Sequence, residues 1–395
     1  MAENDAVIVS VARTPIGKFL GSLSPLSATD LGSIAIREAV KRSGIPGEAF
    51  DEAILGNVVS AGVGQAPARQ AAIKAGLPDA LPALTINKVC GSGLKAVMLA
   101  AQSIKAEDQH VVLAGGMESM SNGPYLLPKA RSGYRYGNGE LIDSVANDGL
   151  WCSFEQCFMG DEAEIIAEKF NVTREEQDRL AYESHMKAAA ATAAGRFKDE
   201  IVAVEIPGKK GVIRIETDES IRPETTIEAL AALKPAFNYG ARTVTAGNAP
   251  GLNDGAAAVV TVSKQYATAH GLAPLARITG YASAAITPKY IFAAPTLAVR
   301  KLMERTNTKI ADYDLIEVNE AFAAQALANA KELDLDWSRV NVNGGSIALG
   351  HPLGASGARI LVTLISELRR RGGGNGLATL CLGGGGAVAM SIIVE

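Results

Sequence analysis

The chain has 395 residues, of which 48% are hydrophobic and 20% are charged. This length fits two domains of ordinary size, and the composition excludes an intrinsically disordered chain. The net charge of −4 provides no basic face for nucleic acid, and no apolar run is long enough to cross a membrane.

Four cysteines are present, at positions 90, 152, 157 and 381. None forms a Cys-x-x-Cys pair, and their spacing does not match a metal site. So few cysteines in so long a chain argue against a secreted disulfide framework. The first residues are acidic and lack the basic and then apolar pattern of a signal peptide. We therefore expect a cytoplasmic protein.

The first part of the chain alternates between predicted strands and helices. An apolar run at residues 6–11 predicts a buried strand, and the spacing of apolar residues predicts a helix over residues 31–43. A strand at residues 52–59 and a helix at residues 65–75 follow. This alternation predicts an α/β fold with a mainly parallel sheet covered by helices on both faces.

A glycine-rich turn at residues 87–93 connects an apolar run to a helix predicted over residues 94–104. Cys90 lies at the start of this helix, where unpaired backbone N–H groups and the helix dipole favour negative charge. The pattern predicts that Cys90 is an activated nucleophile, with thiolate favoured over thiol. The alternative is a cysteine buried beneath a turn, which is the common place of an isolated free cysteine.

The alternation stops after a strand predicted at residues 111–116. The following stretch, to about residue 160, is rich in Gly, Tyr, Asn and Ser. Helices are predicted at residues 161–170 and 173–194, and a hairpin with a Lys209-Lys210 turn at residues 197–222. An insertion between two regular halves typically forms a lid or a binding surface.

From about residue 256 the pattern returns and repeats the first half. Residues 294–319 repeat the helix and strand order of residues 31–58, and residues 344–370 repeat the Cys90 turn and its helix. We read two copies of one α/β unit, each with a glycine-rich turn at the same point. A two-fold arrangement would bring four side chains to one cleft near the carboxyl ends of the strands: Cys90, Asn319, His351 and Cys381.

These side chains could carry out acid–base and nucleophilic chemistry. His351, between Gly350 and Pro352, could take the proton from Cys90. Cys381 could be a second acid–base thiol or a small core residue. Asn319, directly after a predicted strand, could orient a water, donate to an oxyanion, or only satisfy backbone groups.

The motifs around these residues resemble those of the thiolase family along nearly the whole chain. The matching segments are residues 87–93, 115–120, 319–322, 343–352 and 381–385. The resemblance implies a duplicated fold of two mixed, mainly parallel sheets with helices in layers. It also implies an N-terminal half at residues 1–120, to which about 250–274 return, a loop domain at residues 121–249, and a C-terminal half at residues 275–395.

The resemblance implies an acyltransferase that makes acetoacetyl-CoA by a Claisen condensation and cleaves it with CoA. Cys90 would attack a thioester and carry the acyl group, His351 would activate Cys90, and Cys381 would move the α-proton. One oxyanion would be held by His351 and by Asn319 through a water, and the other by the N–H groups of Cys90 and Gly383. Acyl-CoA and CoA would be substrates, with no metal or prosthetic group, and the chain would form a homodimer or homotetramer.

The expected site also includes residues at positions that line the CoA channel in the family. At two of the expected positions near this channel, the residue differs from the one that the family usually has. Phe158 stands where acetoacetyl-CoA thiolases usually have a histidine, which favours a longer or different 3-ketoacyl group. Pro250 replaces a serine and cannot donate a hydrogen bond, which predicts weaker or shifted CoA binding. Two alternatives are a 3-ketoacyl-CoA thiolase of broader chain length and an inactive CoA-binding homologue. The expected substrate-binding residues are Leu150, Phe158, Met159, Arg222, Ala246, Pro250, Ala321 and Phe322.

Overall fold

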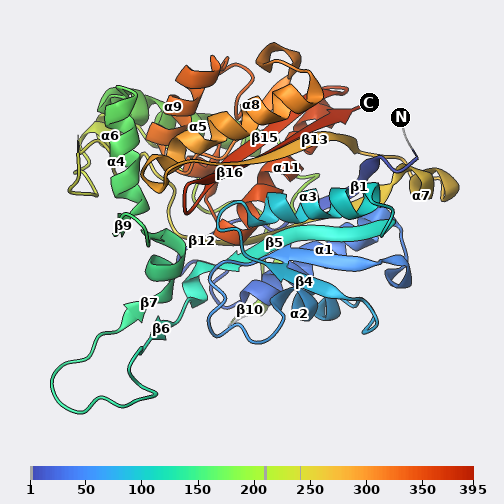
Figure 1. The fold of residues 1–395 in the computed structure, drawn as a ribbon, viewed down its shortest axis with the longest axis horizontal. Coiled ribbons are helices and arrows are strands. Elements are labelled where there is room, and N and C mark those ends of the chain that lie inside the picture. Colours follow the sequence, from blue (N-terminus) through green and yellow to red (C-terminus); the bar gives the residue numbers. More distant parts are fainter. Residues whose placement is uncertain (1–2, 209–210, 241) are drawn as a thin grey trace.

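A computed structural model of the chain describes residues 3–208, 211–240 and 242–395. Ten of its strands form one sheet in the order β14-β15-β16-β13-β1-β12-β5-β3-β4, with β2 paired to β12 (Figure 1). The elements before the insertion are β1 (Ala6–Arg13), β2 (Gly17–Lys18), α1 (Ala28–Ser43), β3 (Glu52–Gly56), α2 (Pro67–Lys74), β4 (Ala83–Ile86), α3 (Ser92–Lys105) and β5 (Val111–Ser119).

The elements after the insertion begin with a strand that returns to the first half. These elements are β12 (Asn253–Ser263), α7 (Lys264–Ala269), β13 (Ala276–Ala285), α8 (Ala294–Thr306), β14 (Leu315–Val318), α9 (Ala323–Leu333), α10 (Ser346–Leu349), α11 (Leu353–Arg370), β15 (Gly374–Leu382) and β16 (Gly386–Val394).

The two halves of the sheet have the same strand order, which confirms the duplication predicted from the repeated pattern. The first half runs β4-β3-β5-β12-β1, and the second runs β14-β15-β16-β13. Val340 forms a parallel bridge with Ile316 of β14, in the place that β4 takes beside β3. The halves meet where β1 pairs with β13, through Val7 with Arg277 and Ile8 with Ala276.

The α/β class is confirmed, but the expectation of mainly parallel sheets is wrong. Only three pairings are parallel among the strands that the structure describes: β3 with β4, β3 with β5, and β14 with β15. Strand β12 enters from the insertion and β16 follows β15 through a short turn at residues 383–385, so neither has the helical crossover that parallel neighbours need. The two expected sheets are also joined into one by the pairing of β1 with β13.

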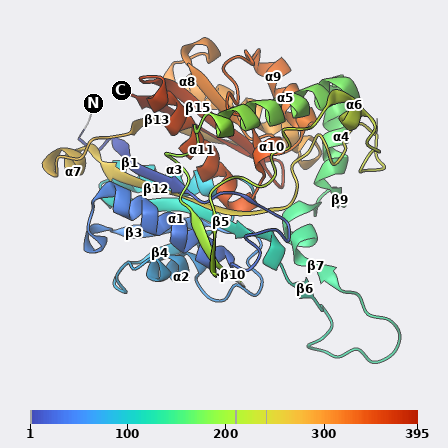
Figure 2. The same ribbon diagram turned by 180° about the vertical axis from the view of Figure 1, so that it is seen from behind.

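Helices lie in three layers around the two halves of the sheet (Figure 2). Helices α3 and α11 are in the middle, and their apolar side chains share one buried cluster with strands of both halves. Helices α1 and α2 pack on the outer face of the first half, and α8 on that of the second. Because α3 and α11 lie between the two halves, most of their residues are buried.

Glycines allow the first turns of α3 and α11 to touch. A Cβ atom at Gly93 would lie 2.7 Å from the backbone nitrogen of Ala358, and one at Gly357 would lie 2.4 Å from that of Leu94. Any side chain at either position would push the helices apart. The close crossing brings the Cys90 turn and the His351 turn, which precede these helices, to one end of the middle layer.

The chain between β5 and β12 leaves the large sheet. Helices α4 and α5 begin and end within two residues of their predicted bounds, and Thr173 caps α5 in the expected capping box. The predicted hairpin is formed by β10 and β11, while its Lys209-Lys210 turn lies outside the described residues. The elements are β6 (Tyr125–Leu126), β7 (Ile142–Asp143), a π-helix (Val145–Leu150), β8 (Trp151–Cys152), β9 (Cys157–Phe158), α4 (Met159–Lys169), α5 (Arg174–Ala193), β10 (Val204–Gly208), β11 (Gly211–Ile215) and α6 (Ile227–Ala231).

The architecture alone does not fix the boundaries of independent domains, so the three expected ranges stay predictions. Among the described residues, none of the helices combines the length and the apolar character that crossing a membrane requires.

Candidate active site

One cavity of about 240 Å³ gathers side chains from both halves of the sheet and from the insertion. Cys90, His351, Cys381 and Gly383 all line it. These residues are far apart in the sequence and each lies in a turn or at a strand end, so the duplicated fold is what brings them together. The geometry is that of a catalytic cleft at the carboxyl ends of strands.

The Cys90 turn is held in a strained shape. Val89 has a φ of 47°, which is unusual for a β-branched residue and costs about 1–3 kcal/mol. The Asn87 side chain accepts a hydrogen bond from the Val89 N–H at 2.9 Å, and the Ser92 hydroxyl donates to the Val89 carbonyl at 2.6 Å. These contacts keep the Cys90 side chain at the wall of the cavity.

Cys90 is a thiol rather than a thiolate in this environment. Burial raises the pKa of the Cys90 thiol to about 12, although the N–H groups of Cys90 and Gly383 oppose the rise. The expectation of a resting thiolate is therefore wrong, because desolvation outweighs the helix start. Attack by Cys90 requires a base that removes the proton as the new bond forms.

His351 has the protonation state of such a base. Its Nδ1 lies 2.5 Å from the Ser356 hydroxyl, which itself donates to the Pro352 carbonyl at 2.8 Å. Since the hydroxyl proton is used on Pro352, Nδ1 must carry the imidazole proton and Nε2 must be free to accept one. Burial, followed by the charge of Arg359, lowers the pKa of His351 to about 3, so the ring is neutral at pH 7.

Side chains that accept hydrogen bonds from backbone N–H groups fix where the His351 turn lies. Gly350 has a φ of 110°, and a Cβ atom there would lie 2.7 Å from the Asn253 side chain. The Asn253 side chain accepts a hydrogen bond from the His351 N–H at 2.8 Å. Glu118 accepts from the N–H groups of Gly354 and Val58, at 2.9 and 3.1 Å, and so ties the start of α11 to the first half.

Cys381 faces the same cavity from β15. Burial, and then the neighbouring Cys90, raises the pKa of Cys381 well above its ordinary value. A thiol that keeps its proton can donate it to a carbanion. The N–H of Gly383, in the turn that follows β15, opposes the rise in the pKa of Cys90, so this backbone dipole acts on the reacting sulfur.

Asn319 is behind the cavity wall rather than part of the lining. Its Nδ2 lies 3.4 Å from Nε2 of His351, and its Oδ1 accepts from the Ser346 hydroxyl at 2.5 Å. The amide N–H₂ group is therefore directed toward the imidazole. Because the atoms of Asn319 do not line the cavity, the amide can act on a ligand there only through a bridging water.

The structure brings seven of the eight expected substrate-binding residues to the cavity. Arg222 is the exception, and its backbone N–H donates to Nδ1 of His185 at 3.1 Å. The residues that line the cavity are Leu150, Phe158, Met159, Ala246, Pro250, Ala321 and Phe322.

Aromatic rings make much of the cavity apolar. Phe158 packs edge-on against Trp151, with ring centroids 4.9 Å apart. Phe322 contacts both Phe292 and Phe237, at 5.3 and 6.5 Å between centroids. Such walls suit an acyl chain or another thin apolar group better than a charged ligand.

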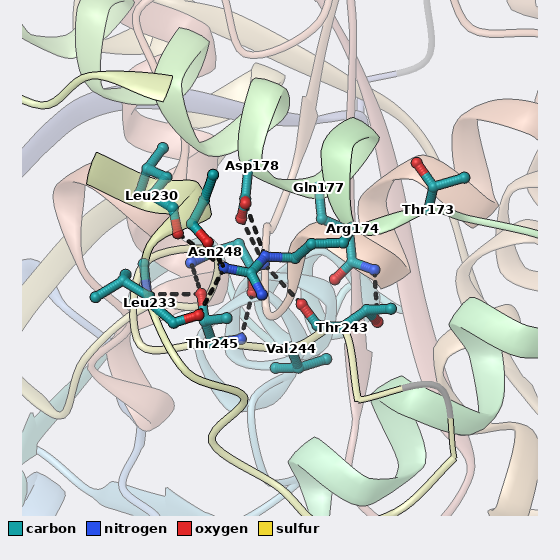
Figure 3. Close-up of polar contacts among 12 residues, drawn as sticks. Thr173, Arg174, Gln177, Asp178, Leu230, Leu233, Thr243, Val244, Thr245 and Asn248 are labelled. Carbon is teal, nitrogen blue, oxygen red and sulfur yellow. Dashed lines mark hydrogen bonds and ion pairs between the residues drawn. The ribbon is translucent and has the colours of Figure 1, made fainter. Parts of the chain in front are cut away.

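A polar network around Asp178 and Asn248 (Figure 3) holds the loop whose residues Ala246 and Pro250 line the cavity. Asn248 donates from Nδ2 to Asp178 at 2.9 Å, and Asp178 accepts from Nε of Arg174 at 2.7 Å. Arg174 also donates to the carbonyls of Leu230 and Leu233, at 2.8 and 2.9 Å. Helix α5 thereby fixes this loop and the segment that leads to Phe237.

Several contributing residues were missed from the sequence. Ser356, Ser346 and Arg359 act behind the cavity, and only their positions in or near the His351 motif gave a signal. Glu118 lies in the matched segment 115–120 but had no assigned role. No group of three or more potential metal ligands occurs in the part of the chain that the structure describes.

Known proteins match this chain over almost all of its length. Residues 6–265 match the family model "Thiolase, N-terminal domain", and residues 272–394 match "Thiolase, C-terminal domain". Acetyl-CoA acetyltransferases of Pseudomonas aeruginosa and Cupriavidus necator are each 53% identical over 389 residues, covering 98% of this chain and 99% of theirs. The crystal structure of the Bacillus anthracis acetyl-CoA acetyltransferase has a TM-score of 0.96 at 45% identity and covers 99% of both chains.

Proposed function

This chain belongs to the thiolase family and is an acyltransferase, and from that premise we propose that it makes and cleaves acetoacetyl-CoA. The observation that carries the proposal is the shared cavity of Cys90, His351 and Cys381, with the free Nε2 of His351 as the base. Acetyl-CoA, acetoacetyl-CoA and CoA are the proposed substrates, and the thiol and imidazole groups supply the chemistry without a resident cofactor.

Cleavage begins with the Cys90 thiol. His351 takes its proton, and the sulfur attacks the 3-keto carbonyl of acetoacetyl-CoA. The N–H groups of Cys90 and Gly383 stabilise the oxyanion that forms. The bond between C2 and C3 then breaks, which leaves an acetyl group on Cys90 and the enolate of acetyl-CoA.

The enolate is stabilised at a second site. Its thioester oxygen is held by protonated His351 and, through a water, by Asn319. Cys381 gives its proton to the α-carbon and becomes a thiolate, and acetyl-CoA leaves. The raised pKa of Cys381 supports this role, because a thiol that ionised readily would have no proton to give at pH 7.

The second half of the reaction transfers the acetyl group. The Cys381 thiolate takes the thiol proton of CoA, and the CoA sulfur attacks the carbonyl carbon of the Cys90 thioester. The bond to Cys90 breaks as its sulfur regains a proton from His351. Condensation is the same sequence in reverse, so the atoms and protons balance in both directions.

A thiolysis assay tests the proposal. Purified protein is incubated with acetoacetyl-CoA and CoA, then with 3-ketoacyl-CoAs of increasing chain length, and loss of the 3-ketoacyl thioester is followed. We expect rapid loss of acetoacetyl-CoA. Loss of longer substrates alone would contradict the acetoacetyl-CoA proposal, and CoA binding without loss of any thioester would indicate an inactive homologue.

The second candidate is a 3-ketoacyl-CoA thiolase of broader chain length. Phe158 favours it, because this ring replaces a polar histidine in a cavity whose other walls are already apolar. An apolar wall stabilises each additional methylene of a substrate. Comparable rates with substrates of several chain lengths would support this candidate.

We also propose a homodimer or homotetramer. Strand β4 is an edge of the large sheet and leaves Leu84 42% exposed. The segment from β6 to β7 extends away from the rest of the fold (Figure 1) and exposes Tyr136 fully and Leu141 at 65%. An open edge and exposed apolar side chains favour burial against a second copy. Sedimentation would distinguish the assemblies from a monomer. The expected cytoplasmic location stays a prediction.

A further inference from the structure

A buried arginine lies behind the Asn319 side chain. We propose that Arg359 is a positioning residue, which fixes the orientation of the Asn319 amide and thereby builds the site for the oxyanion of the CoA thioester. The inference rests on the proposed function, because it uses the role that Asn319 has there.

A chain of hydrogen bonds connects Arg359 to the active site. Nη2 of Arg359 donates to the Ser346 hydroxyl at 2.8 Å, and this hydroxyl donates to Oδ1 of Asn319 at 2.5 Å. Nδ2 of Asn319 then lies 3.4 Å from Nε2 of His351. Arg359 is 2% exposed and the Ser346 and Asn319 side chains are fully buried, so bulk water does not compete for these groups.

Because a guanidinium can only donate hydrogen bonds, the series of hydrogen bonds from Arg359 to Asn319 can run in only one direction. Arginine can only donate hydrogen bonds, so the Ser346 oxygen must accept from it. The single proton of Ser346 must then point to Asn319, where only the carbonyl oxygen can accept it. The N–H₂ group of Asn319 is left facing Nε2 of His351, whose ring lines the cavity, and this is the orientation that an oxyanion site requires.

Pairing of Arg359 with acids does not account for its presence. Nε and Nη1 have no hydrogen-bond partner within the described chain. Glu317 is 3.6 Å from Nη1, and its Oε2 also lacks a hydrogen bond to any described residue. Replacing so imperfect a buried ion pair with apolar residues is often neutral or stabilising. The well-formed contact to Ser346 is therefore the one that gives Arg359 a function.

The proposal separates two partial reactions. Exchange of labelled CoA into acetyl-CoA needs only acylation and deacylation of Cys90, whose oxyanion is held by the N–H groups of Cys90 and Gly383. Thiolysis of acetoacetyl-CoA needs the Asn319 site as well. A loss of general structural integrity would lower both reactions, whereas a loss of the Asn319 orientation would lower thiolysis.

The test measures both reactions in Arg359→Met and Ser346→Ala. We expect kcat for thiolysis to fall about 100-fold in each variant, as for the loss of one oxyanion donor, while CoA exchange stays close to the unchanged protein. Retained exchange also shows that the variant is folded. If Arg359→Met does not fold, Ser346→Ala provides the test, because it removes the hydroxyl that connects Arg359 to Asn319 and leaves all charged groups in place.

Two further variants sharpen the result. Thr363→Val removes a buried hydroxyl one turn after Arg359 on α11. This hydroxyl contacts Glu200 at 3.2 Å and takes no part in the hydrogen bonds from Arg359 to Asn319. The variant should therefore leave both reactions unchanged. Asn319→Ala should show the same selective loss, and adding Arg359→Met to it should lower thiolysis no further.

Three results would overturn the inference: equal loss of exchange and thiolysis in Ser346→Ala, unchanged thiolysis in both single variants, or losses that multiply in the double variant. Failure of the proposed function would look different. In that case the unaltered protein itself would fail to cleave acetoacetyl-CoA.

Discussion

Ser356 determines which nitrogen of His351 carries the proton. The hydroxyl is 2.5 Å from Nδ1 and has already given its own proton to the carbonyl of Pro352. Nδ1 must therefore be the donor, and Nε2 is left to face Asn319 and the cavity as an acceptor. A single hydroxyl in the first turn of α11 thus prepares the base that the Cys90 thiol needs.

Ser356→Ala should lower kcat without a comparable change in KM. The variant leaves the Nδ1 proton of His351 without its buried acceptor, and the ring can then adopt the tautomer with the proton on Nε2. A positioned general base supplies about 10²–10⁴-fold, so we expect a loss of about tenfold to a hundredfold in thiolysis. Steady-state kinetics checks this. An unchanged kcat would show that Ser356 does not select the tautomer.

The rate of Cys90 alkylation should keep rising with pH well above neutrality. Because burial raises the pKa of Cys90 to about 12, the thiolate fraction grows in proportion to hydroxide concentration up to that pH. Mass spectrometry of the Cys90 peptide after brief iodoacetamide treatment measures the rate separately from the other cysteines. A plateau reached between pH 6 and 8 would indicate a resting thiolate and contradict this result.

Much of the fold could be predicted because strands and helices have local sequence signals. The spacing that predicted residues 173–194 as a helix agrees with α5 to within a residue. Strand direction has no such signal. It depends on how β12 and β16 connect to their neighbours, and those connections are a long insertion and a three-residue turn that the alternation of elements does not describe.

The site was predictable only where it follows sequence motifs. Cys90 and His351 lie in glycine-rich turns, and Cys381 lies at the end of a strand directly before such a turn. The repetition of these turns pointed to one cleft, and all three side chains line the cavity. Ser346 and Arg359 gave little signal, since a buried serine or arginine is recognised only from its contacts. The protonation state of Cys90 was predicted wrongly because the helix start is visible in the sequence, while the depth of burial is not.

Cys381→Ala should separate acyl transfer from carbon–carbon chemistry. The variant keeps Cys90, His351 and the N–H of Gly383, so acetyl-CoA should still acetylate Cys90. Without the second thiol no group donates to the α-carbon, and thiolysis should fall to the detection limit. Mass spectrometry detects the acetyl group, which Cys90→Ala should not acquire at position 90. Equal loss of acetylation in both variants would contradict the assigned roles.

Asp178→Asn should weaken CoA binding more than it slows the reaction. The new amide places N–H₂ against Arg174 or Asn248, which are both donors in the present network, so the loop with Ala246 and Pro250 loses a support. One buried hydrogen bond corresponds to about 1–2 kcal/mol, and KM for CoA should rise about tenfold.

The matched control for this loop is Glu175→Gln, an equivalent change at an exposed position in the first turn of the same helix. It should leave KM and kcat unaltered. A lower kcat with normal KM in Asp178→Asn would mean that the network acts on the reacting groups and not on the CoA wall.

Phe158→His should shift the preference of the enzyme toward acetoacetyl-CoA. The Phe158 ring lines the cavity and rests on Trp151, so it offers an apolar wall to an acyl chain, whereas an imidazole is smaller and polar. Contact with one or two methylenes corresponds to about tenfold in discrimination, and the ratio of kcat/KM for acetoacetyl-CoA to that for a six-carbon 3-ketoacyl-CoA should rise by that factor.

Phe154→His is the control, because Phe154 is 70% exposed in the same hairpin and does not line the cavity. If both variants changed the ratio equally, or neither did, position 158 would not determine the chain-length preference, and other rings that line the cavity, such as those of Phe292 and Phe322, would have to do so.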